Sequence, residues 1–215
     1  MPELQVLLND ILRSLESNAR QRPKGSSGHS EPVALIPDAE RAEALARFPR
    51  VPPRWQDFVH PRISAAVTSW TWGNGNMLLL GHTGCGKTVA ATALARRLLL
   101  EATTERDWSR ARRLLFVEAA RLAIAREQHG LGDGEAPLVE RAIRTPLLIL
   151  DEVGYLDKPT GVIEQVIDAR NKSRRPTVAT SGMQPEELQD RYGSATARKM
   201  MAMDPSDLIV QVFTE

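Results

Sequence analysis

The chain of 215 residues is long enough for one domain with a well-developed hydrophobic core and a short appendage. Its hydrophobic content of 42% and charged content of 26% are ordinary for a soluble globular protein, and its net charge of +1 neither demands nor excludes nucleic acid. The single cysteine, Cys85, excludes an internal disulfide and a multi-cysteine zinc site. No apolar stretch has membrane-spanning length and no signal-peptide pattern is visible, so we expect a cytoplasmic protein without membrane contact.

The N-terminal region, residues 1–22, has the pattern of an amphipathic helix. Its apolar residues recur at three- and four-residue steps and are Leu4, Leu7, Leu8, Ile11, Leu12 and Leu15. Residues 23–47 combine a flexible linker rich in Gly, Ser and Pro with a second, short helix over 38–47. The apolar stripe of the first helix either folds back on the main domain or docks on a partner protein.

The main domain is predicted to cover residues 48–215. It begins with a proline-rich, extended segment over 48–58. Helices are expected at 60–70, 89–101, 118–128, 138–144, 161–172, 185–192 and 196–203, and strands at 77–80, 113–117, 146–152, 176–181 and 208–213. Strands that alternate with helices predict an α/β fold with a five-stranded parallel sheet flanked by helices.

A phosphate-binding pattern, G-x-x-x-x-G-K-[ST], lies between the first strand and the helix that Val89 opens. Its residues are Gly81, His82, Thr83, Gly84, Cys85, Gly86, Lys87 and Thr88. The glycines allow the backbone amides to approach a polyphosphate, and the helix adds its positive N-terminal end. Lys87 can reach the β- and γ-phosphates, and the Thr88 hydroxyl can bind Mg²⁺. The pattern predicts that the chain binds a nucleoside triphosphate with Mg²⁺.

Two carboxylates, Asp151 and Glu152, follow the continuous apolar run of the third predicted strand. Asp151 is expected to hold Mg²⁺, through water, and Glu152 to orient the water that attacks the γ-phosphate. An extra strand, at about 114–117, separates these residues from the phosphate-binding loop. Small-molecule kinases with this loop usually carry the Asp on the next strand and lack the adjacent Glu, so the spacing disfavours that class.

Two hydroxyls, Thr180 and Ser181, end the fourth predicted strand at the sheet edge where ligands of open α/β sheets gather. Two interpretations remain open for them. One hydroxyl contacts the γ-phosphate or its attacking water, or both satisfy local backbone groups.

Four segments together resemble the DnaC/IstB group of AAA+ ATPases, P-loop NTPases of the ASCE type. They are residues 48–54, the loop GHTGCGKT, LLILDEVGY at 147–155 and RRPTVATSGMQPEEL at 174–188. The group contains replicative-helicase loaders and the ATP-binding helper of IS21-type transposons. The resemblance implies an ATPase whose site a neighbouring subunit's arginine completes, assembly into rings or helical filaments, and non-specific DNA contact. It also implies that the helix at 1–22 binds a protein partner, a helicase or a transposase.

The chain departs from this group at two places. The group usually has Asn where this chain has Gly182, after the two hydroxyls. The arginine that acts on a neighbour's site is expected in the helix after Gly193, where Arg198 is the best match and an ordinary exposed charge is the alternative. Three functions follow from the resemblance and these departures: a helicase loader, a transposition helper that recruits a transposase, or an ATP-dependent binding module with little hydrolysis.

Overall fold

The computed structural model describes residues 36–130, 132–155, 161–200 and 207–213, and the statements below concern these residues. The predicted helix at 1–22 lies outside them, as do linker residues 23–35 and the end of the helix predicted at 196–203. Within the described ranges, no helix is both long and apolar enough to cross a membrane.

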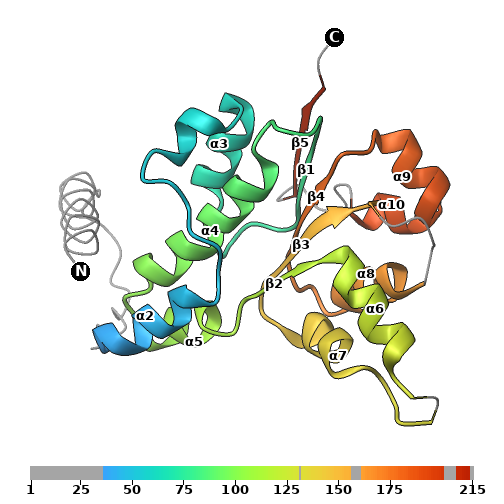
Figure 1. The fold of residues 1–215 in the computed structure, drawn as a ribbon, viewed down its shortest axis with the longest axis horizontal. Coiled ribbons are helices and arrows are strands. Elements are labelled where there is room, and N and C mark those ends of the chain that lie inside the picture. The colour runs from blue at the N-terminus through green and yellow to red at the C-terminus, as the bar shows by residue number, and fades with distance from the viewer. Residues whose placement is uncertain (1–35, 131, 156–160, 201–206, 214–215) are drawn as a thin grey trace, which may run out of the picture.

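Helices and strands alternate along the described chain (Figure 1). The strands are β1 (Met77–Gly81), β2 (Leu115–Glu118), β3 (Leu148–Val153), β4 (Thr177–Ser181) and β5 (Leu208–Val212). The helices are α2 (Asp38–Ala46), α3 (Pro61–Ser69), α4 (Lys87–Glu101), α5 (Glu105–Ala111), α6 (Ala119–Gln128), α7 (Pro137–Arg144), α8 (Val162–Lys172), α9 (Pro185–Tyr192) and α10 (Ser194–Met200), with a 3-10 turn, η1 (Trp55–Phe58).

The strands form one sheet in the order β2-β3-β4-β1-β5, and all neighbours are parallel. The predicted five-stranded parallel sheet with flanking helices is therefore confirmed. Side chains alternate between the two faces of a strand. Met77 and Leu79 accordingly join a core with α2, α3 and α4, while Leu78 and Leu80 join a second core with α6, α7 and α8. Figure 1 shows these two groups of helices on opposite sides of the sheet.

Helix α5 is not predicted by the sequence pattern. It begins because the Thr104 hydroxyl accepts a hydrogen bond of 3.1 Å from the Asp107 N–H, which satisfies one of the free amides at a helix start. The helix has 7 residues, of which Trp108 and Ala111 are buried. Two buried positions are too few to produce a recognisable helical repeat.

Helix α2 packs against the end of α4. Ala44 and Leu45 join the core on that side of the sheet. Arg41 donates hydrogen bonds to carbonyl oxygens that the end of a helix leaves without intrahelical donors, those of Leu99, Leu100 and Ala102. Helix α2, the short helix predicted over 38–47, thus contributes two buried side chains to the core around the sheet.

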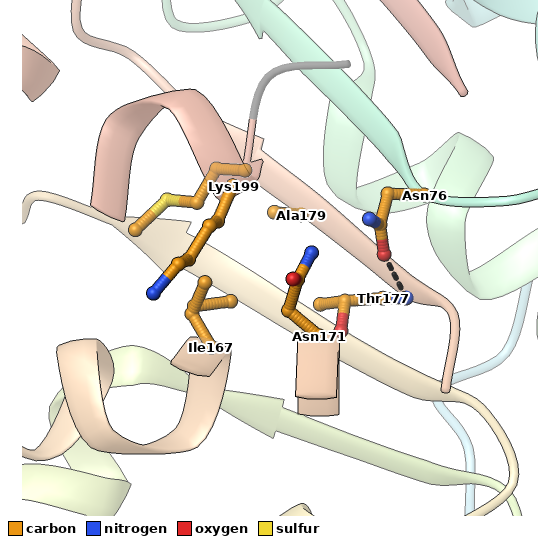
Figure 2. Close-up of a pocket in the computed structure, with 7 residues that line it drawn as sticks. Asn76, Ile167, Asn171, Thr177, Ala179 and Lys199 are labelled. Carbon is orange, nitrogen blue, oxygen red and sulfur yellow. Dashed lines mark hydrogen bonds between the residues drawn. The ribbon is translucent and has the colours of Figure 1, made fainter. Parts of the chain in front are cut away.

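Asn76 joins the beginnings of three strands. Its side-chain oxygen accepts a hydrogen bond of 2.8 Å from the Thr177 N–H, which Figure 2 shows, and its carbonyl oxygen accepts one of 2.8 Å from the Leu208 N–H. A cavity beside Asn76 and Lys199 has a volume of about 10 Å³, enough for a single water molecule. It is too small for a larger ligand.

Arg170, near the end of α8, is a buried cation with 1% of its surface exposed. Its guanidinium donates hydrogen bonds to the Thr177 hydroxyl and to the carbonyl oxygens of Ala142, Ile143, Thr145 and Pro176. Burial lowers the pKa of this guanidinium to about 9, with the charge of Arg175 as a smaller cause, so it remains protonated at neutral pH. Arg170 therefore connects the end of α7 to the start of β4.

The substitution Arg170→Met is expected to lower the free energy of unfolding by about 3 kcal/mol, because buried acceptors lose their donor where water does not reach them. Urea denaturation followed by circular dichroism measures the change. Lys172→Met is the control, because Lys172 is exposed and forms a surface ion pair with Asp168, so a loss within about 0.5 kcal/mol is expected. Similar midpoints for the two variants would contradict the assigned role.

Candidate functional site

A cavity of about 680 Å³ opens at the carboxyl ends of β1, β3 and β4. Several residues that the sequence selects line it, namely Thr83, Gly84, Gly86, Lys87, Thr88, Val89, Glu152, Thr180 and Ser181. This is the edge of a parallel sheet at which ligands bind in open α/β folds. The topology therefore brings three separate motifs of the sequence to one cavity.

The loop between β1 and α4 depends on glycine at position 86. Gly86 has φ of 90°, in the left-handed region that other residues rarely adopt. A Cβ atom there would lie 2.7 Å from the Phe58 carbonyl oxygen and 2.7 Å from the Val59 side chain. Glycine thus lets the loop turn into α4 against the segment that precedes α3.

Lys87 begins α4, and its side chain extends back across the loop. Its ammonium group donates hydrogen bonds to the carbonyl oxygens of Gly81 at 2.7 Å and His82 at 3.0 Å. The N-terminal end of α4 lies at the same place, so the free amides of the helix and the lysine charge both face the cavity. The arrangement is suited to an anion.

Not every residue of the loop lines the cavity. The His82 N–H donates a hydrogen bond of 3.2 Å to the Val212 carbonyl oxygen, so the start of the loop is fastened to β5. Gly81 lies in β1, and Cys85 is buried in the core behind the loop. These three residues shape the loop, whereas the cavity wall begins at Thr83.

Asp151, at the end of β3, accepts hydrogen bonds from two hydroxyls through a single carboxylate oxygen. The Thr88 hydroxyl donates at 3.0 Å and the Thr180 hydroxyl at 2.6 Å. Asp151 is 3% exposed, and its burial raises the pKa of the carboxyl group, against the opposite effect of the two hydroxyls. A cation bound next to the carboxylate would favour its ionised form.

Glu152 lies in a bulge of β3. Leu150 pairs with Ala179 and Val153 pairs with Ser181, so β3 has one extra residue at this point. Glu152 itself has φ of 56°, which is uncommon for a residue other than glycine and is found preferentially at functional sites. Its N–H donates a hydrogen bond of 3.0 Å to the Thr180 hydroxyl.

Asp151 and Glu152 differ in exposure, although they are adjacent in the chain. Asp151 is buried beneath the loop and Glu152 is exposed at the cavity wall. The Thr180 hydroxyl contacts both residues, since it donates to the Asp151 carboxylate and accepts from the Glu152 amide. Thr180 therefore holds the two acidic residues in position relative to each other.

Ser181 behaves differently from Thr180. Its hydroxyl donates a hydrogen bond of 2.6 Å to the Val153 carbonyl oxygen and accepts one of 3.1 Å from the Met183 N–H. The side chain is fully buried. The Ser181 hydroxyl thus bonds to local backbone groups, which is one of the two interpretations given above. The Thr180 hydroxyl instead donates to the Asp151 carboxylate.

The cavity also contains two exposed aromatic residues that the sequence analysis does not select. Phe58, from η1, is 64% exposed, and Tyr155, just after β3, is 79% exposed. Exposed aromatic side chains that gather at a cavity are typical of binding surfaces. Tyr155 ends the segment LLILDEVGY that contains the two carboxylates, so the sequence contains a signal for it, whereas Phe58 belongs to no motif.

Arg198, in α10, is exposed and lies outside the residues that line the cavity of its own chain. The neighbouring Lys199 forms an ion pair with Asp168 of α8. Of these two adjacent cations, Arg198 is the one whose side chain points to solvent.

The family of IstB-like ATP-binding proteins matches residues 59–202 of this chain. This range contains the loop, both carboxylates, the hydroxyl-bearing strand end and Arg198. No curated protein shows a significant match to the chain.

Several solved structures are similar in fold. The structure of the DnaC helicase loader has 18% sequence identity and a TM-score of 0.51, with 81% of this chain and 100% of that chain covered. AMPPCP-bound DnaA from Aquifex aeolicus has 16% identity and a TM-score of 0.51, with 78% and 49% covered. DnaA bound to AMPPCP and single-stranded DNA has 14% identity and a TM-score of 0.57, with 78% and 52% covered. The chain thus spans about half the length of these DnaA structures, and identities this low show similarity of fold alone.

Proposed function

We propose that this chain, which belongs to the family of IstB-like ATP-binding proteins, hydrolyses ATP to load or remodel a DNA-processing machine, specifically a replicative helicase. Its membership in the DnaC/IstB group of AAA+ proteins confirms the resemblance found in the sequence. The observation that carries the proposal is the convergence of Lys87, Thr88, Glu152 and Thr180 on one cavity, with Asp151 buried behind it and hydrogen-bonded to Thr88 and Thr180.

ATP is proposed to bind with its phosphates against the loop and the N-terminal end of α4. Lys87 would exchange its bonds to the loop carbonyls for bonds to phosphate oxygens. The cavity also extends to Phe58, a flat apolar surface on which the base of the nucleotide can stack.

Mg²⁺ is proposed to lie next to Thr88 and Asp151. The hydroxyl and the carboxylate are hard oxygen donors, which this cation prefers, and they are already 3.0 Å apart. Among the described residues, no three His, Cys, Asp or Glu side chains form a metal site. The two protein oxygens therefore fit a cation that takes its other ligands from phosphate and water.

Glu152 is proposed to orient and polarise the water that attacks the γ-phosphate. Its exposed position at the cavity wall leaves room for a water molecule, and the Thr180 hydroxyl fixes its backbone. Gly182 also lines the cavity and contributes no side chain. The Thr180 hydroxyl is the group of the β4 end that contacts both acidic residues, Asp151 and Glu152.

Assembly of several copies is part of the proposal. Arg198 does not line its own cavity and is free to enter that of a neighbouring copy in a ring or helical filament. A site without this guanidinium lacks charge stabilisation in the transition state, so an isolated chain is expected to turn over slowly. The helix predicted at 1–22 is proposed to bind the partner protein.

The test is ATP hydrolysis with and without single-stranded DNA, together with light scattering in ATP and in ADP. We expect DNA to increase turnover and ATP to promote assembly, because both would bring Arg198 of one copy to the site of another. A nucleotide-bound monomer whose hydrolysis is indifferent to DNA would contradict the loader function.

A transposition helper is the second candidate, because the matching family is that of IstB-like ATP-binding proteins. Such a protein would assemble on DNA and recruit a transposase through residues 1–22. Filaments on DNA that have no affinity for a replicative helicase would select this alternative.

A further inference from the structure

A second cavity, of about 440 Å³, opens at the edge of the sheet opposite the ATP site. It lies where the chain enters β2 and β3, between the ends of α2 and α7 and the turn after α5, elements on the lower side of Figure 1. Its walls carry five arginines, Arg47, Arg112, Arg113, Arg141 and Arg144. An adjoining cavity of about 360 Å³ shares three of them, Arg47, Arg112 and Arg113. We call the two together the arginine groove.

The arginines of the groove outnumber its carboxylates, five to three, since Glu140 lines the larger cavity and Glu40 and Glu43 line the adjoining one. Glu140 pairs with Arg144 at 2.8 Å, and Glu40 lies 3.6 Å from Arg112. Arg141 makes no ion pair or side-chain hydrogen bond with any residue that the structure describes. Burial lowers the pKa of Arg47, and the nearby charge of Arg141 lowers it further, against the opposite effect of Glu43. These like charges repel one another, and a polyanion would relieve the repulsion.

Capping of α7 does not explain the arginines at its end. Cations near a helix C-terminus are favoured because they bond the terminal carbonyl oxygens. Here the Ala142, Ile143 and Thr145 carbonyl oxygens accept instead from Arg170, and Ile143 also accepts from Arg175. Arg141 and Arg144 therefore remain exposed, with 74% of the Arg144 side chain open to solvent.

We propose that the arginine groove binds the phosphodiester backbone of a DNA strand. Guanidinium groups form paired hydrogen bonds with phosphate oxygens, and five of them line one depression. Protein partners are typically held by apolar and aromatic anchor side chains in pockets. The exposed large apolar side chains of the described chain, Phe58, Ile124, Tyr155 and Ile209, all lie outside the groove. For the same reason no base stacks here, and binding is independent of sequence and sensitive to salt.

This site deepens the proposed function by giving its DNA contact a place. It lies at the edge of the sheet away from the ATP cavity, so DNA can be held without obstructing nucleotide exchange. It also combines α2 with α5 and α7, which are distant in the sequence.

The test is binding of a fluorescent single-stranded oligonucleotide of mixed sequence to the full chain in the presence of ATP. The double variant Arg141→Gln, Arg144→Gln is expected to weaken binding on the order of tenfold at about 50 mM salt. The plot of log K against log salt concentration has a negative slope. Its magnitude should decrease by about 1.4 in the variant, or by about 0.7 for each phosphate that the variant no longer neutralises. The control is Arg62→Gln, Arg121→Gln, which removes the same charge from exposed positions of α3 and α6 outside the groove. It should keep the wild-type affinity.

The outcomes separate the groove from the ATPase. DNA binding that survives the groove substitutions, or that falls equally in the control, overturns the groove and leaves DNA-directed ATPase function in place. Polyglutamate that competes as well as an oligonucleotide of equal charge also overturns it, in favour of an acidic protein partner. A wild-type chain that hydrolyses ATP but binds no oligonucleotide overturns both the groove and the DNA part of the proposed function. Retained ATP binding by the groove variant shows that it is folded.

Discussion

Replacing Glu152 with Gln is expected to reduce ATP hydrolysis by about 10²- to 10⁴-fold while leaving ATP affinity within about twofold. The amide keeps the size of the side chain but removes the negative charge that is proposed to orient and polarise the attacking water. Binding is preserved because Lys87 and the loop, which would hold the phosphates, are unchanged. Phosphate release under DNA-stimulated conditions and titration with a fluorescent ATP analogue measure the two quantities.

Glu118→Gln is the matched control for that substitution. Glu118 lies at the end of β2, pairs in register with Asp151 and does not line the cavity. The control removes one negative charge from the same sheet edge and should keep a rate within about threefold of wild type. Equal losses in both variants would indicate a general electrostatic effect. A near-zero rate in the wild type that Glu152→Gln leaves unchanged would indicate a binding module with little hydrolysis.

The substitution Arg198→Ala is expected to reduce hydrolysis by about 10³- to 10⁵-fold, as for other arginines that stabilise a phosphoryl-transfer transition state from a neighbouring subunit. The change should not affect ATP binding, because Arg198 lies outside the cavity of its own chain. Lys199→Ala is the control, since that side chain is held by Asp168 on the same chain. Steady-state hydrolysis at a concentration at which the chain assembles is the measurement.

Mixing two inactive variants tests whether Arg198 acts between copies. Lys87→Ala chains lack a functional triphosphate site but still carry Arg198, whereas Arg198→Ala chains have the site but lack the arginine. A mixture should therefore regain part of the activity. A mixture that stays inactive although both variants assemble, or an Arg198→Ala chain with the wild-type rate, would exclude the role.

Much of the fold is predictable because its signals are local. The strands of a parallel sheet covered on both faces are continuous apolar runs, so β1 and β3 are evident in the sequence. The phosphate-binding loop is equally local, because glycine, lysine and threonine act within eight consecutive positions. The structure confirms the strands and their parallel arrangement. Helix α5 is missing from the prediction because seven residues with two buried positions carry little periodic signal.

The geometry of the candidate site depends on pairings between distant segments. The sequence places Asp151 and Glu152 next to each other but contains no mark of the β3 bulge, which arises from the register of β3 against β4. That register brings the Thr180 hydroxyl to both residues and distinguishes it from Ser181. Residue type alone cannot make this distinction, since both are hydroxyls at one strand end.

The roles of two arginines, Arg170 and Arg141, likewise become distinct only in the tertiary structure. In the sequence, Arg170 and Arg141 are equivalent charges near helix ends. In the structure, Arg170 is buried among carbonyl oxygens, and this leaves Arg141 exposed in the arginine groove. The sequence by itself determined the ATP-binding motif, the strands and the family, because each can be identified from short segments without knowing how those segments pack. The tertiary structure decided which hydroxyl contacts the Asp151 carboxylate and which arginines face solvent, because both depend on contacts between segments that only folding brings together.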